Sequence, residues 1–364
     1  MQLTRRRRSV TRGPLAVAVV ALAAAPAWAD GELSMRGVYY KERATRVIQP
    51  MLDGLFEVGD HGTADAHVLV DAITSASVAA GNDGTYFTER RVEGGGGYVR
   101  EVDLYKVGAS VRYSSEPDYT SMFFGVRGAV ELFDRNLAVT ASANLGKDSM
   151  SNAGAPPMVP RLEDDLSTVL GSIGLAQLLG RDMVASLTYD VSRLEGQQAN
   201  LYRSVIAAGM QVAERHPDRR TRHAVAATFK WFVPSTMTTL IAGYRRYHDS
   251  WDLDAHTPEV RVIQDVGDGT AFSVRYRYHR QDKATFYQPR YDSSTLEFLS
   301  DDIKLSAFDS HTMAAALELS GDVLGFTGRL GEMRGQIVIE YIDQNNRFGN
   351  ALVAHAALTV PFAY

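Results

Sequence analysis

The feature that most constrains this chain is an alternation of apolar and polar residues that recurs through most of its length. In Tyr105 to Tyr113, for example, Tyr, Val, Ala, Val and Tyr alternate with Lys, Gly, Ser and Arg. Successive side chains of a strand point to opposite faces, so this segment has one apolar face with an aromatic residue at each end. Amphipathic helical periods are hard to find. The chain is therefore predicted to be all-β.

The last residues of the chain extend this pattern to its end. Leu358, Val360, Phe362 and Tyr364 share one face of an extended chain, although Pro361 is unfavourable in a sheet ladder. Termini of soluble domains usually fray into water, whereas a membrane barrel places such a face against lipid. A closing strand that ends in an aromatic residue resembles the assembly signal of bacterial outer-membrane proteins. Phe362 and Tyr364 are the predicted signal, to be read by the barrel-assembly machinery.

The first residues have the pattern of a secretory signal peptide. Arg5 to Arg8 precede an apolar run from Leu15 to Ala25, and Ala27-Trp28-Ala29 fits a small-x-small cleavage site. Residues 1–29 are predicted to be removed, leaving one domain over residues 30–364. The segment carries five arginines and no acid, so its removal changes the formal net charge from −5 to −10. An acidic chain argues against nucleic acid as a partner, and the absence of cysteine excludes disulfides and thiolate chemistry.

The predicted connections fall into two alternating classes. Short turns are expected at 59–62, 100–101, 134–135, 180–181, 234–235, 266–268 and 321–324. Longer loops are expected at 78–85, 149–165, 196–221, 282–301 and 344–349, with brief links near 115–118 and 250–253 on the same side. Short periplasmic turns and longer extracellular loops characterise outer-membrane barrels. We therefore expect a transmembrane antiparallel up-and-down β-barrel of about 16 strands, within 14–18. Its surroundings would be outer-membrane lipid and lipopolysaccharide. A soluble β-sandwich is the alternative, but it does not explain the alternating loop lengths.

Several short motifs resemble a family of proteobacterial outer-membrane proteins known as domain of unknown function 3570. The motifs, all as they stand in this sequence, are Val70 to Ser77, Glu116 to Tyr119, Phe133 to Asn136, Pro217 to Arg220, Tyr244 to Trp251, Asp254 to Thr257, Ala284 to Tyr287 and Leu305 to Phe308. The resemblance covers essentially the whole chain after the signal peptide. It implies an outer-membrane β-barrel and supplies no catalytic residue, activity or cofactor. The opening strands and Gly94 to Gly97 match it least well.

Charged residues on the polar faces of the predicted strands are the candidates for lining a lumen. They are Lys106, Arg112, Arg127, Glu131, Lys230, Arg275, Arg277, His279, Glu318 and Glu340. Charge is expensive against lipid, so these side chains are expected to point inward. A barrel of this size leaves an aqueous channel unless something plugs it. We therefore predict a porin-like passive channel for small solutes, with Arg275, Arg277 and His279 as an anion-favouring stripe. The alternative is a structural, assembly or binding barrel with a plugged lumen, in which the charges pair across the wall.

One predicted hairpin gathers polar residues at the barrel rim. His248-Asp249-Ser250 ends one strand, and Asp254-Ala255-His256 begins the next. Nucleophilic catalysis needs a base held by a carboxylate, so a rim-sited membrane hydrolase is a second class of hypothesis. The plainer interpretation is ordinary loop polarity. Asp164-Asp165 and Asp301-Asp302 offer oxygen ligands for Ca²⁺, but no spacing typical of a metal site is present, so no metal or other cofactor is predicted.

Overall fold

The computed structural model describes residues 30–76, 86–152, 161–267 and 269–362. The signal peptide predicted over residues 1–29 and the aromatic residue Tyr364 lie outside these ranges. The strands, in chain order, are β1 (Gly31–Lys41), β2 (Thr45–Val58), β3 (Gly62–Ala76), β4 (Tyr86–Val102), β5 (Tyr105–Ser115), β6 (Tyr119–Leu132), β7 (Leu137–Ser151), β8 (Glu163–Leu178), β9 (Met183–Gly196), β10 (Ser204–Ala207), β11 (Met210–Ala213), β12 (Arg219–Val233), β13 (Thr238–Asp249), β14 (Asp254–Gly267), β15 (Thr270–Gln281), β16 (Phe308–Ser320), β17 (Arg334–Gln344) and β18 (Ala351–Phe362). Among these residues, no helix has the length and apolar composition needed to cross a bilayer.

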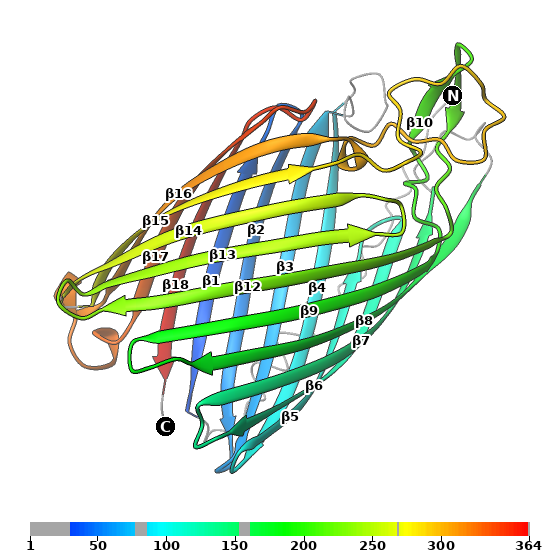
Figure 1. Cartoon of the computed structure of the whole chain (residues 1–364). Coiled ribbons are helices and arrows are strands. Elements are labelled where there is room, and N and C mark those ends of the chain that lie inside the picture. The colour runs from blue at the N-terminus through cyan, green and yellow to red at the C-terminus, as the bar shows by residue number, and fades with distance from the viewer. Residues whose placement is uncertain (1–29, 77–85, 153–160, 268, 363–364) are drawn as a thin grey trace, which may run out of the picture.

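Sixteen of these strands form one closed antiparallel barrel (Figure 1). Each strand pairs with its neighbour in the chain, β12 follows β9, and β18 returns to pair with β1 along its whole length. β10 and β11 form a separate hairpin within the connection from β9 to β12. This is the predicted up-and-down barrel of the outer-membrane type, with the predicted number of strands.

The alternation in the sequence explains how each strand faces the two sides of the wall. On β5, Tyr105, Val107, Val111 and Tyr113 are exposed on the outer surface, although they are large and apolar. The residues between them point into the barrel. A band of large apolar side chains on the outside is expected where a lipid bilayer, rather than water, surrounds the wall.

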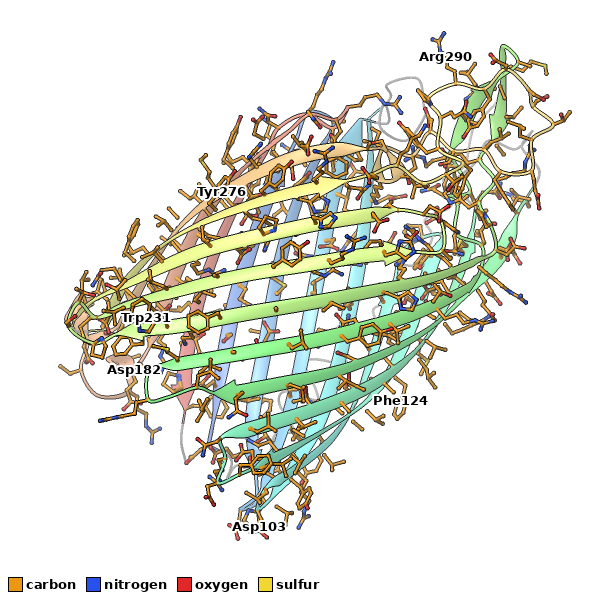
Figure 2. The ribbon with its side chains drawn as sticks, viewed as in Figure 1. Asp103, Phe124, Asp182, Trp231, Tyr276 and Arg290 are labelled. Carbon is orange, nitrogen blue, oxygen red and sulfur yellow. The ribbon has the colours of Figure 1, made fainter. Side chains whose placement is uncertain are left out.

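The connections follow the predicted alternation, and we call the two ends of the barrel the short-turn end and the long-loop end. Figure 2 shows Asp103 and Asp182 at the short-turn end and Arg290 at the long-loop end. Two predicted turns were wrong in their bounds. The turn expected at 100–101 lies at 103–104, because β4 continues to Val102. The short turn expected at 321–324 is a longer connection, because β17 begins only at Arg334.

The segment before β17 contains two short 3-10 helices instead of a strand. They are η3 (Asp322–Leu324) and η4 (Gly328–Leu330). Gly325 and Gly328 have φ values of 84° and 60°, which belong to the left-handed region and break an extended chain. The apolar residues Phe326 and Leu330 imitate a strand face in the sequence, but these glycines turn the backbone away.

Most of the buried apolar residues lie in the loops at the long-loop end, and the few others, such as Leu194 and Val353, lie on barrel strands. One cluster contains Trp251, Leu253, Ala284, Tyr287 and Leu305, and a second contains Val205, Ala207, Tyr291 and Leu299. They join the β9–β12 connection (197–218), the β13–β14 link and the β15–β16 connection (282–307), which includes η2 (Ile303–Leu305). We call this assembly the cap. Figure 1 shows its hairpin and loop standing beyond the barrel wall at one end.

Candidate functional site

The inner wall of the barrel holds the predicted lumen-lining residues. Lys106 and Arg112 lie on β5, Arg127 and Glu131 on β6, Lys230 on β12, Arg275, Arg277 and His279 on β15, Glu318 on β16 and Glu340 on β17. Apart from His279, each has at least one large apolar neighbour on its strand that is exposed on the outside. Lys106 and Arg127 line one inner cavity of ≈ 380 Å³, and Arg275 and Glu340 line another of ≈ 250 Å³. That they select a solute stays a prediction.

Many of these charges pair with a charge of opposite sign on the same wall. The pairs are Lys106 with Glu101 at 3.0 Å, Arg112 with Glu93 at 3.6 Å, Arg127 with Asp65 at 3.8 Å and Glu131 with Arg135 at 3.2 Å. Yet the side chains are not packed against one another. Those of Arg112 and Arg127 are 57% and 58% exposed although they face the barrel interior. The wall is therefore both charge-balanced and wet.

The predicted basic stripe on β15 is also balanced by acids. Glu259 lies within 4.0 Å of Arg261, Arg275 and Arg277, and Arg275 pairs in addition with Glu340. The Nδ1 atom of His279 lies 2.9 Å from the Thr257 hydroxyl. Three arginines face two glutamates here, so most of the positive charge expected from the stripe is neutralised. The anion preference expected at Arg275 and Arg277 is therefore weaker than the sequence predicts.

The glycine tract of β4 makes room for charged side chains of β3. A Cβ atom added at Gly95 would lie 2.5 Å from the His67 ring, and one at Gly97 would lie 2.7 Å from the Asp65 carboxylate. β4 is nonetheless the longest strand, with 17 residues, and not the weak one that its glycines predict. Pairing on both sides, with β3 and β5, compensates for the low strand propensity of glycine.

The rim cluster predicted as a hydrolase site is divided between two faces of the wall. His248, Asp254 and His256 face outward, where His248 Nδ1 lies 3.3 Å from Asp254 and His256 Nδ1 pairs with the Tyr244 hydroxyl. Asp249 points the other way, because strand alternation puts neighbours on opposite faces. Within the described residues, no histidine bonds to Ser250, whose hydroxyl accepts from Thr221 N at 3.0 Å. The cluster does not assemble a nucleophile, base and carboxylate.

Asp249 is instead the anchor of the cap. It has 0% exposure and accepts hydrogen bonds from Arg220 Nε at 2.8 Å, the Tyr247 hydroxyl at 2.7 Å and the backbone N–H groups of Trp251 at 2.9 Å and Leu253 at 3.2 Å. The Arg220 guanidinium also lies 4.1 Å from the centre of the Trp251 ring. The alternation of faces was already a signal in the sequence that Asp249 and His248 serve different roles.

A second buried polar group in the cap was not predicted from the sequence. Arg203 lies between the carboxylates of Glu214 at 3.3 Å, Asp302 at 3.3 Å and Asp301 at 3.6 Å. Arg347, from the link before β18, also pairs with Asp301. Burial raises the pKa of Asp301 above its ordinary value, although Arg347 and Arg203 oppose this shift. These residues come from three separate connections, so no local pattern could have joined them.

Three of the four aspartates considered as Ca²⁺ ligands form ion pairs. Asp301 and Asp302 pair with arginines, and Asp165 pairs with Lys147 at 2.9 Å. Across the residues that the structure describes, no group of three or more His, Cys, Asp and Glu side chains has the geometry to hold a metal ion.

A closed 16-strand barrel with an apolar outer band and a charged, wet interior defines a transmembrane β-barrel of the outer-membrane class. The chain belongs to the family described as "Protein of unknown function (DUF3570)", whose model matches residues 78–323. The match leaves out β1 to β3 and all of β17 and β18, so it is shorter than the resemblance in the sequence. Gly94 to Gly97 lie within it.

Solved structures with this fold include a "Bacterial polysaccharide outer membrane secretin". It has a TM-score of 0.55 and 7% sequence identity, over 91% of this chain and 98% of that one. The outer-membrane protein OprD from Pseudomonas aeruginosa aligns with a TM-score of 0.47 and 10% identity, over 92% and 94% of the two chains. OpdQ of the same organism has a TM-score of 0.47 and 12% identity, over 92% and 98%. A comparison with curated proteins finds no match. At these identities the likeness concerns the fold alone.

Proposed function

We propose that residues 30–364 form a porin-like passive channel for small solutes in a bacterial outer membrane. The observation that carries the proposal is the half-exposed state of Arg112 and Arg127 on the inner wall. Side chains of a packed interior are buried, so inward-facing arginines with this exposure require space for water. Sixteen strands give a bore of the size found in aqueous channels. The short-turn end then faces the periplasm and the cap faces the outside.

The cap sets the width of this channel at its outer end. Residues of its two long connections, such as Asn200 and Leu305, line one cavity together with Glu89 of β4 and Arg220 of β12. These two strands are separated by β5 to β9 in the barrel, so the loops reach across the mouth from one side to the other. The solute therefore passes through a narrowed entrance into a wider tube.

Conductance in a planar lipid bilayer tests the proposal. Refolded residues 30–364 are expected to give stable single-channel steps, because the inner wall carries hydrated charge along its length. Silence from protein that is shown to be folded and inserted would contradict an open lumen. The matched variant replaces the β9–β12 connection, residues 197–218, by a short Gly-Ser link.

The plugged barrel remains the second candidate, and the core of the cap favours it. Loops that are only entrance walls have no need of two buried apolar clusters, whereas a stable plug does. If the intact chain is silent and the shortened chain conducts, the cap closes the lumen and the barrel serves as a binding or structural protein. If both conduct, with a larger step for the shortened chain, the cap is an entrance.

A further inference from the structure

The cavity beneath the cap is the place where a solute would first meet the barrel. Its volume is ≈ 440 Å³, within the range of about 300–1,000 Å³ that is usual for small-molecule sites. Its lining includes β4, the β5–β6 link, β12 and the two cap segments 197–203 and 302–305, and β6 to β9, His216 and Trp251 complete it. Most of the charged side chains that face it stand in two groups of opposite sign.

The acidic group consists of Glu89, Glu116 and Asp118. Within the described part of the chain, none of the three forms an ion pair, since the nearby Arg91 is bound to Asp71 at 2.7 Å. Burial raises the pKa of Glu116, Asp118 and Asp71 raise it further, and Arg91 opposes them. The three carboxylates line the same cavity, and a cation placed among them would relieve the repulsion between their charges.

The basic group lies six strand positions away in the barrel order, on β12 and the cap. Arg222 points into the cavity without an ion pair among the described residues, and its Nε atom is buried without a hydrogen-bond partner. Lys304, which acts on Glu42 electrostatically, lies in the same lining. Arg220, in contrast, is neutralised by Asp249. Arg222 and Lys304 are thus the positive charges of this group that no ion pair among the described residues neutralises, and Arg222 also has the unpaired buried Nε atom.

A buried histidine supports the view that this cavity is built to bind. The His216 side chain is 5% exposed and lies in the cavity lining. Its Nε2 atom lies 2.9 Å from the Ser300 hydroxyl, but its Nδ1 atom has no hydrogen-bond partner within the described residues. Buried polar atoms are usually paired, so an unpaired one beside a cavity marks a place for a ligand or for ordered water.

We propose that the cap cavity is a recognition site for small zwitterionic solutes, with the cationic end at Glu116 and its neighbours and the anionic end at Arg222. The inference rests on the proposed channel function and adds the class of solute. Opposite charges on facing walls produce a field across the entrance, which is strengthened by the low-dielectric protein around it. A solute with both charges gains at both ends, whereas a simple ion gains at one wall and is repelled by the other.

Vesicle swelling with two solutes of the same size tests this. Vesicles that contain refolded residues 30–364 are exposed to equal gradients of threonine, a zwitterion, and erythritol, which is neutral. Threonine is expected to enter faster. In Glu116→Gln and in Arg222→Gln the ratio of the two rates should fall towards unity, because each variant removes one half of the recognition. The reversal potential in KCl should shift towards anions in Glu116→Gln and towards cations in Arg222→Gln.

Matched controls lie on the outer wall. Arg219→Gln changes a side chain that is 78% exposed on the same strand as Arg222, and Glu195→Gln changes its acidic neighbour. Both should leave the rates and the reversal potential unchanged. Equal entry of threonine and erythritol through a conducting wild-type barrel would overturn the inference and leave the channel standing. Absence of both conductance and swelling from inserted protein would instead overturn the channel itself.

Discussion

Replacement of Asp249 by asparagine is the sharpest test of how the cap is held. Asp249→Asn keeps the size of the side chain but removes the charge that faces Arg220, and both residues are buried. Breaking a buried ion pair by removing one partner costs about 3–5 kcal/mol, because the remaining charge stays in a poorly solvated site. The equilibrium between formed and unfolded cap should therefore shift by a factor of roughly 150 to 5,000.

The tryptophans of the chain make this change measurable. Without residues 1–29 the chain retains Trp231 and Trp251 alone. Trp231 lies on the outer wall near the short-turn end (Figure 2), whereas Trp251 is buried in the cap, with its ring centre 5.2 Å from that of Phe286. In a Trp231→Phe background, guanidinium titration followed by Trp251 emission reports the cap selectively.

A matched surface variant gives the scale of the expected effect. Glu195→Gln removes an exposed carboxylate that pairs with Arg193, and a pair of this kind contributes about 0.2–1 kcal/mol. If Asp249→Asn destabilises the cap by no more than this, the buried Arg220–Asp249 pair is not what holds it. Replacing both Arg220 and Asp249 by apolar residues of similar size should recover much of the loss, since no isolated charge then remains.

Three further predictions concern the glycine tract of β4, Glu116 at the entrance and the pairing of β18 with β1 that closes the barrel. Gly95→Ala should destabilise the barrel by about 1–3 kcal/mol, since the new Cβ would lie 2.6 Å from the Val111 carbonyl oxygen. Gly94→Ala should cost little, because the nearest atom to its new Cβ is 3.7 Å away. Urea titration in lipid vesicles compares the stability of the two variants. Because the pKa of Glu116 is raised, this side chain should become protonated at a higher pH than an ordinary glutamate as the pH is lowered. The reversal potential should then shift towards anions. The same pH response in Glu116→Gln would contradict this. Phe362→Ala removes a ring of β18 whose centre lies 5.9 Å from that of Phe56 on β2, across Gly31 of β1, so the closure of β18 onto β1 and β2 should lose about 0.5–1.5 kcal/mol beyond its buried area. The folded fraction after refolding into vesicles measures this, with the outward-facing Leu352→Ala as the comparison.

The barrel was predictable from the sequence because its physical signal is local. The alternation in Tyr105 to Tyr113 depends only on neighbouring residues and on the two environments that a membrane wall separates. The start of β12 was harder to locate. Arg219 to Arg222 are polar on both faces, since this part of the strand has water or the cap on either side, and the prediction treated it as loop. Where the environment is the same on both sides, the alternation disappears.

The cap was not predictable, because its contacts join distant loops. Trp251 packs with Ala284 and Leu305. Arg203 pairs with Glu214 in its own connection and with Asp302 in the β15–β16 connection. The sequence did single out Asp249, but as a candidate for catalysis. Its burial and its four hydrogen-bond donors give it a structural role that only the three-dimensional arrangement reveals.

The core of the cap also has a consequence for the order of folding. Val205 and Leu299 belong to connections that lie side by side only after β12 to β15 have paired between them. Contacts with such large separation along the chain form late, because their loop-closure entropy is offset only once the intervening hairpins are in place. Trp251 emission should therefore reach its final value after the wall has closed. A newly inserted molecule then passes through a stage in which the barrel is closed but the cap is not yet formed. At that stage its outer entrance is wide, and formation of the cap narrows it.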